Sequence, residues 1–523
     1  MVKKQLNIKQ LGPTVLVILD GFGLANPKNP GNAITPQTAP YIFSCLDKYP
    51  HSTLKTWGKH VGFFPHQQGN SEAGHMNIGA GRIVKQDLVQ ISDAIADGTF
   101  FKNEAFKQAV YHLKKYKTDA HILALLTNKE TCVHAYPEHL YALLKFFREE
   151  GIHKVFLHLI TDGRDSSPHS APDFLQELRI KMKNQEKIAT IMGRFYAMDR
   201  NRIWSRTQEA YEAMVLGKGC IAESAEEALT QSYNREEIDE FICPTVIVEK
   251  KKPVGLVKDN DAIFFTNARS DRARQITKVF VQKDFQKKNP GSFSRAKFPQ
   301  NTRFVAMSDF GPDLDNVMTA FPSVDLQGTL PMVLKNKKQL YIAESEKYAH
   351  VTYFINGGYA DPVNGEIRVK IPSPKIDHYD KEPEMSAPEI TDEVVRYISK
   401  NNADFICVNF ANADMIGHTG NIVAAKKAIR IVDKCVKRIV EAVLQKHGQL
   451  LITADHGNAE EMYDLKTGEM MTRHSLNPVP CILIRSNFKG LKFKNGILAD
   501  VAPTLLKMMS VKKPKEMTGK ALF

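Results

Sequence analysis

Acidic and histidine side chains follow three apolar runs of the sequence, at the points where buried strands would end. The set consists of Asp20, Asp414, His418, Asp455 and His456, which follow the runs 15–19, 405–410 and 450–453. Ligands of open α/β sheets gather at the carboxyl ends of the strands, so these side chains are expected to lie together. Because oxygen and imidazole ligands in one set suit Mn²⁺ or Zn²⁺, the pattern indicates a metal site.

Two spacings within this set predict how it could bind ions. Asp414 and His418 are four residues apart, so they share one face and can bind one cation if 412–420 opens a helix. Asp455 and His456 are neighbours, and in a loop they can point to opposite sides and serve two ions. Two such ions hold a phosphoryl group and activate a nucleophile. One Asp-Gly or Asp-His pair is often an ordinary loop, but three such places and His474 favour the metal site.

Ser71 is the candidate nucleophile because it lies in the glycine-rich segment 68–82. Glycines on both sides let the backbone turn sharply and approach a phosphate, and a following helix would place its positive end beside the serine oxygen. A serine hydroxyl attacks only after a metal or a base has taken its proton. On the local sequence alone, a simple helix cap is an equally good interpretation of Ser71.

Arginines, instead of acids, follow the apolar runs in the middle of the chain. They are Arg164, Arg194, Arg200, Arg206, Arg269, Arg272 and Arg274. Arg269 and Arg272 are three residues apart and could present two guanidinium groups to a phosphate or a carboxylate. For any one of them the alternative is a structural ion pair or a surface position. An acidic site built from both ends of the chain and a cationic site built from its middle predict an inserted domain.

Apolar runs alternate with amphipathic segments along the whole chain. The runs are 15–19, 122–126, 155–159, 188–191, 263–266, 405–410 and 450–453, and the helix-like segments include 138–150, 171–182 and 422–443. This alternation predicts an α/β fold, with a mainly parallel sheet covered by helices. The 523 residues exceed the roughly 250 to 300 that a single core serves, so two domains are expected.

Composition excludes several classes of protein. With 43% hydrophobic and 25% charged residues, the chain is not predominantly disordered. No apolar run approaches the roughly 20 residues of a membrane span. Seven scattered cysteines form no disulfide-like framework, so a cytoplasmic protein with reduced thiols is expected. The net charge of +13 suits a small anionic ligand better than nucleic acid, because the lysine runs lack interleaved aromatic residues.

A series of longer segments resembles the cofactor-independent (2,3-bisphosphoglycerate-independent) phosphoglycerate mutases of the alkaline phosphatase superfamily. In that family's order, the segments are 16–23, 69–82, 161–165, 196–200, 271–276, 343–352, 372–375, 409–420 and 453–459. The resemblance implies an α/β fold with an alkaline-phosphatase-like metal-binding domain, residues 1–86 and 321–523. An α/β phosphotransferase domain that binds the substrate, residues 87–320, would be inserted into it.

The same resemblance implies an isomerase of glycolysis and gluconeogenesis. It would interconvert 3-phosphoglycerate and 2-phosphoglycerate through a phosphoserine on Ser71. It would use two Mn²⁺ ions per chain, with other divalent metals possible, and would require no 2,3-bisphosphoglycerate. The implied partners are the small-molecule substrates, without nucleic acid or membrane, and the implied state is a cytoplasmic monomer.

Residue roles also follow from the resemblance. Two metal sites are implied: Asp414, His418 and His474 for one ion, and Asp20, Ser71, Asp455 and His456 for the other. Ser71, Asp165 and Lys347 would be catalytic: Asp165 would move protons to and from the glycerate hydroxyls, and Lys347 would compensate negative charge on the phosphoryl oxygens. Substrate contacts are implied for His134, Arg164, Asp165, Arg200, Arg206, Arg269, Arg272 and Lys347.

Two stretches depart from the family pattern, so their substrate contacts stay open. Residues 127–136 lack an expected glycine pair, and Ile203 stands where an arginine is expected, with Arg202 one place earlier. Three alternatives remain: a metal-dependent phosphatase of the same superfamily, a catalytically lapsed binding homologue, and a basic nucleic-acid-binding protein. The arginine-rich middle of the chain argues against a simple phosphatase, and the intact candidate metal ligands argue against a lapsed enzyme.

Overall fold

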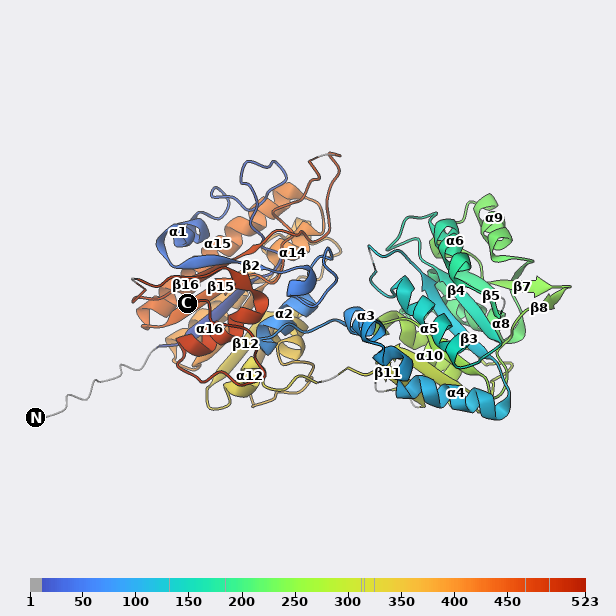
Figure 1. Ribbon diagram of the computed structural model, residues 1–523. Coiled ribbons are helices and arrows are strands. Elements are labelled where there is room, and N and C mark those ends of the chain that lie inside the picture. The colour runs from blue at the N-terminus through green and yellow to red at the C-terminus, as the bar shows by residue number, and fades with distance from the viewer. Residues whose placement is uncertain are drawn as a thin grey trace, which may run out of the picture. The chain divides into compact units, whose positions relative to one another are not determined.

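The computed structural model describes residues 12–130, 132–183, 185–311, 313–314, 316–323, 325–465, 467–488 and 490–523. The chain forms two compact units, Met1–Gln86 with Asp325–Phe523 and Asp87–Val324. Each unit has its own sheet and its own helices (Figure 1). The predicted α/β fold class is therefore confirmed, with one mainly parallel sheet in each unit.

The sheet of the first unit, Met1–Gln86 with Asp325–Phe523, has eight strands in the order β13-β12-β14-β1-β15-β16-β2-β17. The strands are β1 (Thr14–Leu19), β2 (His51–Lys55), β12 (Gln339–Glu344), β13 (Ile367–Ile371), β14 (Phe405–Phe410), β15 (Gln449–Thr453), β16 (Val479–Ile484) and β17 (Gly496–Ile497). The five strands from β13 to β15 are parallel, and β16 pairs antiparallel with both β15 and β2. The predicted strands at 15–19, 405–410 and 450–453 are confirmed as β1, β14 and β15.

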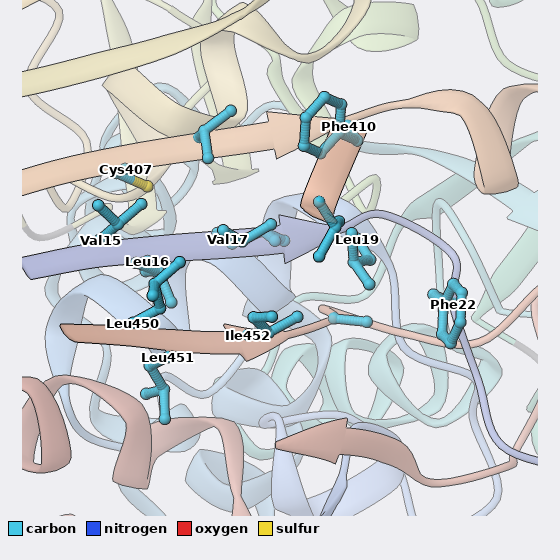
Figure 2. Packing of buried hydrophobic residues seen from close by; sticks show 14 of the residues in the cluster. Val15, Leu16, Val17, Leu19, Phe22, Cys407, Phe410, Leu450, Leu451 and Ile452 are labelled. Carbon is cyan, nitrogen blue, oxygen red and sulfur yellow. The ribbon is translucent and has the colours of Figure 1, made fainter. Parts of the chain in front are cut away.

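Strand β1 lies at the centre of the hydrophobic core, between β14 and β15 (Figure 2). All six of its residues are buried, which explains the unbroken apolar run: a strand covered on both faces has no polar side. Each fully buried valine or leucine side chain stabilises the fold by roughly 1.5–3 kcal/mol. The end of β1 is therefore a rigid support for the polar residues that follow it.

Helices cover this sheet. They are α1 (Pro40–Lys48), α2 (Ser71–Ala80), α12 (Leu330–Val333), α13 (Ala387–Ser399), α14 (Asn412–Gly417), α15 (Ile422–Gln445) and α16 (Val501–Met508), with short helical turns at Gly58–His60, Ser345–Lys347, His350–Phe354, Tyr379–Lys381 and Leu498–Asp500. The predicted helix at 422–443 is confirmed as α15. The Asn421 side chain caps this helix by accepting a hydrogen bond from the backbone N–H of Ala424.

The second unit, Asp87–Val324, has a sheet in the order β11-β10-β9-β3-β4-β5-β7-β6, with β8 paired to β7. The strands are β3 (Ala120–Leu126), β4 (Val155–Thr161), β5 (Glu186–Gly193), β6 (Cys220–Ala222), β7 (Thr245–Glu249), β8 (Lys252–Pro253), β9 (Ala262–Phe265), β10 (Arg303–Ser308) and β11 (Val317–Phe321). The six strands from β11 to β5 are parallel. The remaining predicted strands are confirmed here as β3, β4, β5 and β9.

The helices of the second unit are α3 (Asp87–Asp97), α4 (Glu104–Tyr116), α5 (Pro137–Glu149), α6 (Ala171–Lys181), α7 (Arg194–Ala197), α8 (Trp204–Leu216), α9 (Ala225–Asn234), α10 (Ser270–Val281) and α11 (Phe285–Lys288), with short turns at Thr99–Lys102 and Asp239–Phe241. The predicted helices at 138–150 and 171–182 are confirmed as α5 and α6. In the part of the chain that the structure describes, no helix is both long enough and apolar enough to cross a membrane.

Strand β11 decides where the second unit ends. The resemblance implies an inserted domain of residues 87–320; β11 continues one residue further, to Phe321, and pairs with β10 inside the second sheet. The second compact unit begins after Gln86 and ends at Val324, so it includes the whole of β11.

Candidate active site

Four neighbouring parallel strands of the first unit are followed at their carboxyl ends by charged residues, three of them the predicted aspartates. In the order β12-β14-β1-β15, the residues that follow are Lys347, Asp414, Asp20 and Asp455. The ends coincide because Leu19 of β1 is level with Phe410 of β14, and Ile18 is level with Thr453 of β15. Sheet topology thus brings together residues that are hundreds of positions apart in the sequence.

Gly21 allows Asp20 and Asp414 to approach each other. Its φ of +73° lies in the left-handed region, and a Cβ atom there would come within 2.7 Å of the backbone nitrogen of Asp414. The backbone N–H of Asp414 also donates to the carbonyl of Asp20 over 3.1 Å. The turn after β1 is therefore built against the start of α14, and only glycine fits at this position.

Ser71 is the first residue of α2, and it does not cap that helix. The cap is Asn70, whose side chain accepts a hydrogen bond from the backbone N–H of Ala73 over 2.8 Å. The interpretation of Ser71 as a simple helix cap is therefore wrong. Its hydroxyl oxygen is left for other contacts and lies 3.2 Å from Asp20 Oδ1 and 2.9 Å from His456 Nε2.

Lys347 is the cationic group at the centre of this site. It is buried, and its ammonium group donates hydrogen bonds to Asp20 Oδ1 over 2.7 Å, to Ser71 Oγ over 2.8 Å and to Asp414 Oδ2 over 2.6 Å. Burial alone would lower the pKa of this ammonium, but Asp20 and Asp414 outweigh burial and raise it. Lys347 therefore stays charged beside the serine oxygen.

Two clusters of possible metal ligands lie around Ser71. Asp414, His418 and His474 form one, and Asp20, Asp455 and His456 form the other; the ligand atoms of each lie within 4.8 Å of one another. The first cluster contains the three residues implied for one ion, and the second contains three of the four implied for the other, without Ser71. His418 follows α14 directly, so the predicted four-residue spacing from Asp414 does place both side chains together, with Nε2 and Oδ1 3.1 Å apart.

The imidazoles are oriented as metal ligands would be. The Nδ1 atoms of His418 and His474 face the backbone carbonyls of Thr472 and Gly69, at 2.6 and 2.7 Å. Those contacts place the ring proton on Nδ1 and leave a lone pair on each Nε2. The two Nε2 atoms lie only 3.1 Å apart, and each lies within 3.2 Å of Asp414 Oδ1. A cation between these atoms fits the donor set.

The second cluster has the same need for positive charge. Asp455 Oδ2 is buried, and among the described residues it accepts no hydrogen bond of good geometry, although His75 Nδ1 lies 3.3 Å away. Burial, with help from the neighbouring Asp455, raises the pKa of Asp20 to about 6. Burial lowers the pKa of His456 to about 3, so its imidazole is neutral and offers a lone pair. In the described part of the site, three buried carboxylates lie beside the one ammonium group of Lys347, and this imbalance also fits bound divalent cations.

Sequence reasoning missed two residues that connect the ligands. Asn409 Nδ2 donates to Asp20 Oδ2 over 2.8 Å and lies 3.0 Å from His75 Nε2. His75 Nδ1 in turn lies 2.9 Å from the carbonyl of Ser71 and 3.3 Å from Asp455 Oδ2. The available signal was Asn409 itself, a polar residue inside the otherwise apolar strand β14.

The predicted cationic residues occupy the corresponding position in the second unit. There the four neighbouring parallel strands are β9, β3, β4 and β5. The side chains that follow their carboxyl ends are Arg269 and Arg272 after β9, His134 after β3, Arg164 and Asp165 after β4, and Arg194 after β5. The sequence-predicted substrate residues after β9, β3 and β4 thus gather at one edge of this sheet.

Arg194 organises the centre of this cluster. It was one of the arginines of the predicted cationic site, but the family resemblance implied no substrate contact for it. Its buried guanidinium pairs with Asp162, and with Asp165 Oδ2 over 2.6 Å. It also donates to His134 Nε2 over 3.1 Å. Burial and the charge of Arg194 lower the pKa of His134 to about 3, so this imidazole is neutral.

Several arginines crowd together at this edge. Burial, followed by repulsion from Arg194, Arg200 and Arg164, lowers the pKa of Arg272. Asp271 offsets part of this charge: it lies 2.7 Å from Arg200 NH1 and 3.3 Å from Arg269 Nε. Arg164 is mostly exposed and lies 3.4 Å from Glu240. The cluster keeps an excess of positive charge, which suits an anionic ligand.

Arg206 lies differently from the other predicted arginines. Its guanidinium pairs with Asp199 Oδ1 over 3.1 Å and stacks over the Phe195 ring at 3.7 Å from the ring centre. Of the two departures from the family pattern, Ile203 is an exposed residue just before α8. Residues 127–136 include Thr131, which lies outside the described residues.

Two family models match the chain. The model described as the BPG-independent PGAM N-terminus matches residues 91–312, and the model described as type I phosphodiesterase / nucleotide pyrophosphatase matches residues 292–478. The first falls on the unit with the arginine cluster. Much of the second falls on the unit with the metal-type clusters.

Characterised relatives are similar over almost the whole length. The chain is 47% identical over 515 residues to the 2,3-bisphosphoglycerate-independent phosphoglycerate mutase of Clostridium botulinum (strain Langeland), covering 98% of this chain and 99% of the relative. It is 46% identical over 513 residues to the protein of that name from Acetivibrio thermocellus, covering 97% and 98%. The crystal structure of Leishmania mexicana phosphoglycerate mutase at low cobalt concentration matches with a TM-score of 0.73 and 26% identity, over 99% of both chains.

Proposed function

Because the chain belongs to the family of 2,3-bisphosphoglycerate-independent phosphoglycerate mutases, we propose that it interconverts 3-phosphoglycerate and 2-phosphoglycerate through a phosphoserine on Ser71. The observation that carries this proposal is the environment of the Ser71 hydroxyl oxygen. It lies within 3.2 Å of Lys347 Nζ, His456 Nε2 and Asp20 Oδ1, next to both clusters of possible metal ligands.

Asp414, His418 and His474 would hold one divalent ion, and Asp20, Asp455 and His456, together with Ser71, would hold the other. We propose Mn²⁺ as the resident ion, because both sets mix carboxylate oxygen with imidazole nitrogen. Ions bound there would lower the pKa of the serine hydroxyl and neutralise charge on the phosphoryl oxygens. The active species would be a cytoplasmic monomer that needs no 2,3-bisphosphoglycerate.

Ser71 and Lys347 act in the transfer itself. Ser71 Oγ attacks the phosphorus of 3-phosphoglycerate, and the bond between phosphorus and the C3 oxygen breaks as the new bond forms. Lys347 already donates to Ser71 Oγ, so its ammonium group is positioned to donate to phosphoryl oxygens as negative charge gathers there. The C2 hydroxyl of the glycerate then attacks the phosphoserine, which releases Ser71 and gives 2-phosphoglycerate.

Asp165 moves the protons, and the arginines hold the glycerate. Asp165 takes the proton from the attacking C2 hydroxyl and supplies the one that the departing C3 oxygen needs. Arg194 fixes the Asp165 carboxylate through an ion pair of 2.6 Å. The glycerate carboxylate and its hydroxyl groups are bound by a set of surrounding side chains, namely His134, Arg164, Arg200, Arg206, Arg269 and Arg272.

A phosphorus NMR time course tests the proposal. Purified protein is loaded with Mn²⁺ and given 3-phosphoglycerate in the absence of bisphosphoglycerate. The expected result is an equilibrium mixture of 3- and 2-phosphoglycerate without inorganic phosphate, and a phosphorylated peptide containing Ser71 after rapid acid quenching. Release of inorganic phosphate alone would identify a phosphatase instead, and an unchanged spectrum would overturn the proposed activity.

A further inference from the structure

Cys220 and Cys243 bring their sulfur atoms together at the edge of the second sheet, and neither residue was assigned a role in the mutase reaction. Cys220 begins the edge strand β6, and Cys243 lies two residues before β7. The two Sγ atoms are 2.7 Å apart, and both residues are half-buried free thiols. The backbone N–H of Cys220 donates to the carbonyl of Pro244 over 3.0 Å, which holds the two segments in register.

The surroundings of this pair favour a covalent link over a metal site. Among the described residues, no third His, Cys, Asp or Glu side chain joins the two sulfurs in a cluster that could hold an ion. A disulfide bond has a length of about 2.05 Å, so the sulfurs need to move by less than about 1 Å to form one. The half-buried position leaves both thiols accessible to a small oxidant.

We propose that Cys220 and Cys243 form a reversible disulfide by exchange with a low-molecular-weight disulfide. One cysteine thiolate attacks a sulfur of the small disulfide, which releases one small thiolate and leaves a mixed disulfide on the protein. The second cysteine thiolate then attacks the protein sulfur of that mixed disulfide and releases the other small thiolate. The two protons of the cysteine thiols pass to the two released thiolates, so one small disulfide becomes two small thiols.

The disulfide would close a loop whose last residues support the arginine cluster. Within the segment 221–242, the carbonyl of Asp239 accepts a hydrogen bond from Thr161 Oγ1 over 2.7 Å, and the carbonyl of Ile242 accepts one from Gly193 over 2.8 Å. These bonds fasten the segment to Thr161 at the end of β4, three residues before Arg164, and to Gly193 at the end of β5, directly before Arg194. Because closure needs so small a movement, the disulfide would brace this support without displacing it.

The test uses the full chain, reduced and then equilibrated in buffers of increasing oxidised glutathione. Free thiols are blocked with a maleimide, and the protein is digested without reduction for mass spectrometry. A peptide pair linked through Cys220 and Cys243 is expected to rise with the oxidised share and to disappear again with dithiothreitol. The internal controls are the buried cysteines Cys45, Cys132, Cys407, Cys435 and Cys481, which should stay out of any disulfide.

Matched variants separate the pair from two independent thiols. Cys243→Ser should trap glutathione on Cys220, because no second thiolate remains to release it. Hydrogen exchange of residues 239–242 in the oxidised wild type should slow by roughly 100-fold, because the closed loop opens less often. The proposal is overturned if both thiols remain blocked by the maleimide in the most oxidising buffer, or if wild-type Cys220 keeps its glutathione. Unchanged exchange would overturn the bracing role, and none of these readouts depends on mutase activity.

Discussion

Both units place charged side chains after the ends of four neighbouring parallel strands, but the two sets of side chains have opposite charge. In each, polar side chains follow four neighbouring parallel strands: β12, β14, β1 and β15 in the first unit, and β9, β3, β4 and β5 in the second. The first unit places three buried carboxylates there, whereas the second places the buried Arg194 and several partly exposed arginines, namely Arg164, Arg200 and Arg269. The topology of the sheet therefore decides where a site forms, and the residues after the strands decide its chemistry.

The charges in the two sites are also balanced in different ways. In the described part of the first site, Lys347 pairs with Asp20 and Asp414, and a third buried carboxylate, Asp455, lies beside them, so a bound cation fits the excess negative charge. In the second site, carboxylates such as Asp271, which lies 2.7 Å from Arg200, offset part of the repulsion between the arginines. An anionic substrate can relieve the repulsion that remains there. The first site should therefore depend on metal, and the second on the negative charge of the substrate.

The largest expected effect on mutase activity comes from a substitution of Ser71 in the first unit. Ser71→Ala removes the proposed nucleophile, so mutase activity should fall by about 10⁴-fold or more. The melting temperature should stay close to that of the wild type, because Asn70 and not Ser71 caps α2. Coupled enzyme assays and thermal unfolding measure the two quantities.

Asn70→Ala is the matched control for this variant. Loss of the cap should lower the free energy of unfolding by roughly 0.5–2 kcal/mol while a phosphoserine still forms on Ser71. The nucleophile assignment would be wrong if Ser71→Ala kept more than a tenth of the wild-type rate.

The next largest effect should follow from breaking one metal cluster. Asp414→Asn removes the carboxylate that lies within 3.2 Å of both His418 Nε2 and His474 Nε2. The manganese content after gel filtration should fall from two ions to one per chain, and activity should fall by at least about 100-fold. Asp392→Asn, which changes an exposed carboxylate on α13, should alter neither value. Two retained ions in the Asp414 variant would contradict the ligand assignment.

Variants of the second unit should affect substrate binding more than metal content. Arg272→Gln should raise KM for 3-phosphoglycerate by roughly 10- to 100-fold, the worth of one charge-assisted contact, and leave two ions bound. Arg206→Gln should raise KM by less, because Asp199 and the Phe195 ring already engage its guanidinium. Arg179→Gln, at an exposed pair with Glu226, is the control. Equal increases of KM in the Arg272 and Arg206 variants would show that the contacts of Arg206 with Asp199 and Phe195 do not limit its binding of the substrate.

The fold class and many residues of the two sites were predictable from the sequence, whereas the order of the strands and the contacts between distant residues were not. The apolar runs and the residues directly after them gave the fold class and most of the two sites, because burial on both faces leaves a continuous signal. The order of strands leaves no such signal: β12, which carries Lys347 into the first site, was not among the predicted runs. The contact between His75 and Asn409 depends on the packing of α2 against β14, and no spacing in the chain records it.

The smallest of the expected effects is a loss of stability of the second unit in acid, caused by protonation of His139. His139 in the second unit is buried on α5 and lies 2.9 Å from Ser92 Oγ, and burial lowers its pKa to about 3. A folded pKa below the unfolded value near 6.5 means that the unfolded chain binds more protons between these values. The stability from neutral His139 is therefore complete above about pH 6.5 and is lost as the pH falls, by roughly 2 kcal/mol between pH 7 and pH 5.

His139→Gln tests this origin of the acid sensitivity, because glutamine can still bond to Ser92 but cannot take up a proton in this range. Denaturant unfolding followed in the second unit should lose roughly 2 kcal/mol of its pH dependence between pH 7 and pH 5 in this variant. His153→Gln is the control, because His153 is exposed in the turn between α5 and β4 of the same unit. If the His139 variant kept the full pH dependence of the wild type, another group would have to carry the acid sensitivity. A profile flattened by this amount would instead show that protonation of the buried His139 carries this part of the acid sensitivity.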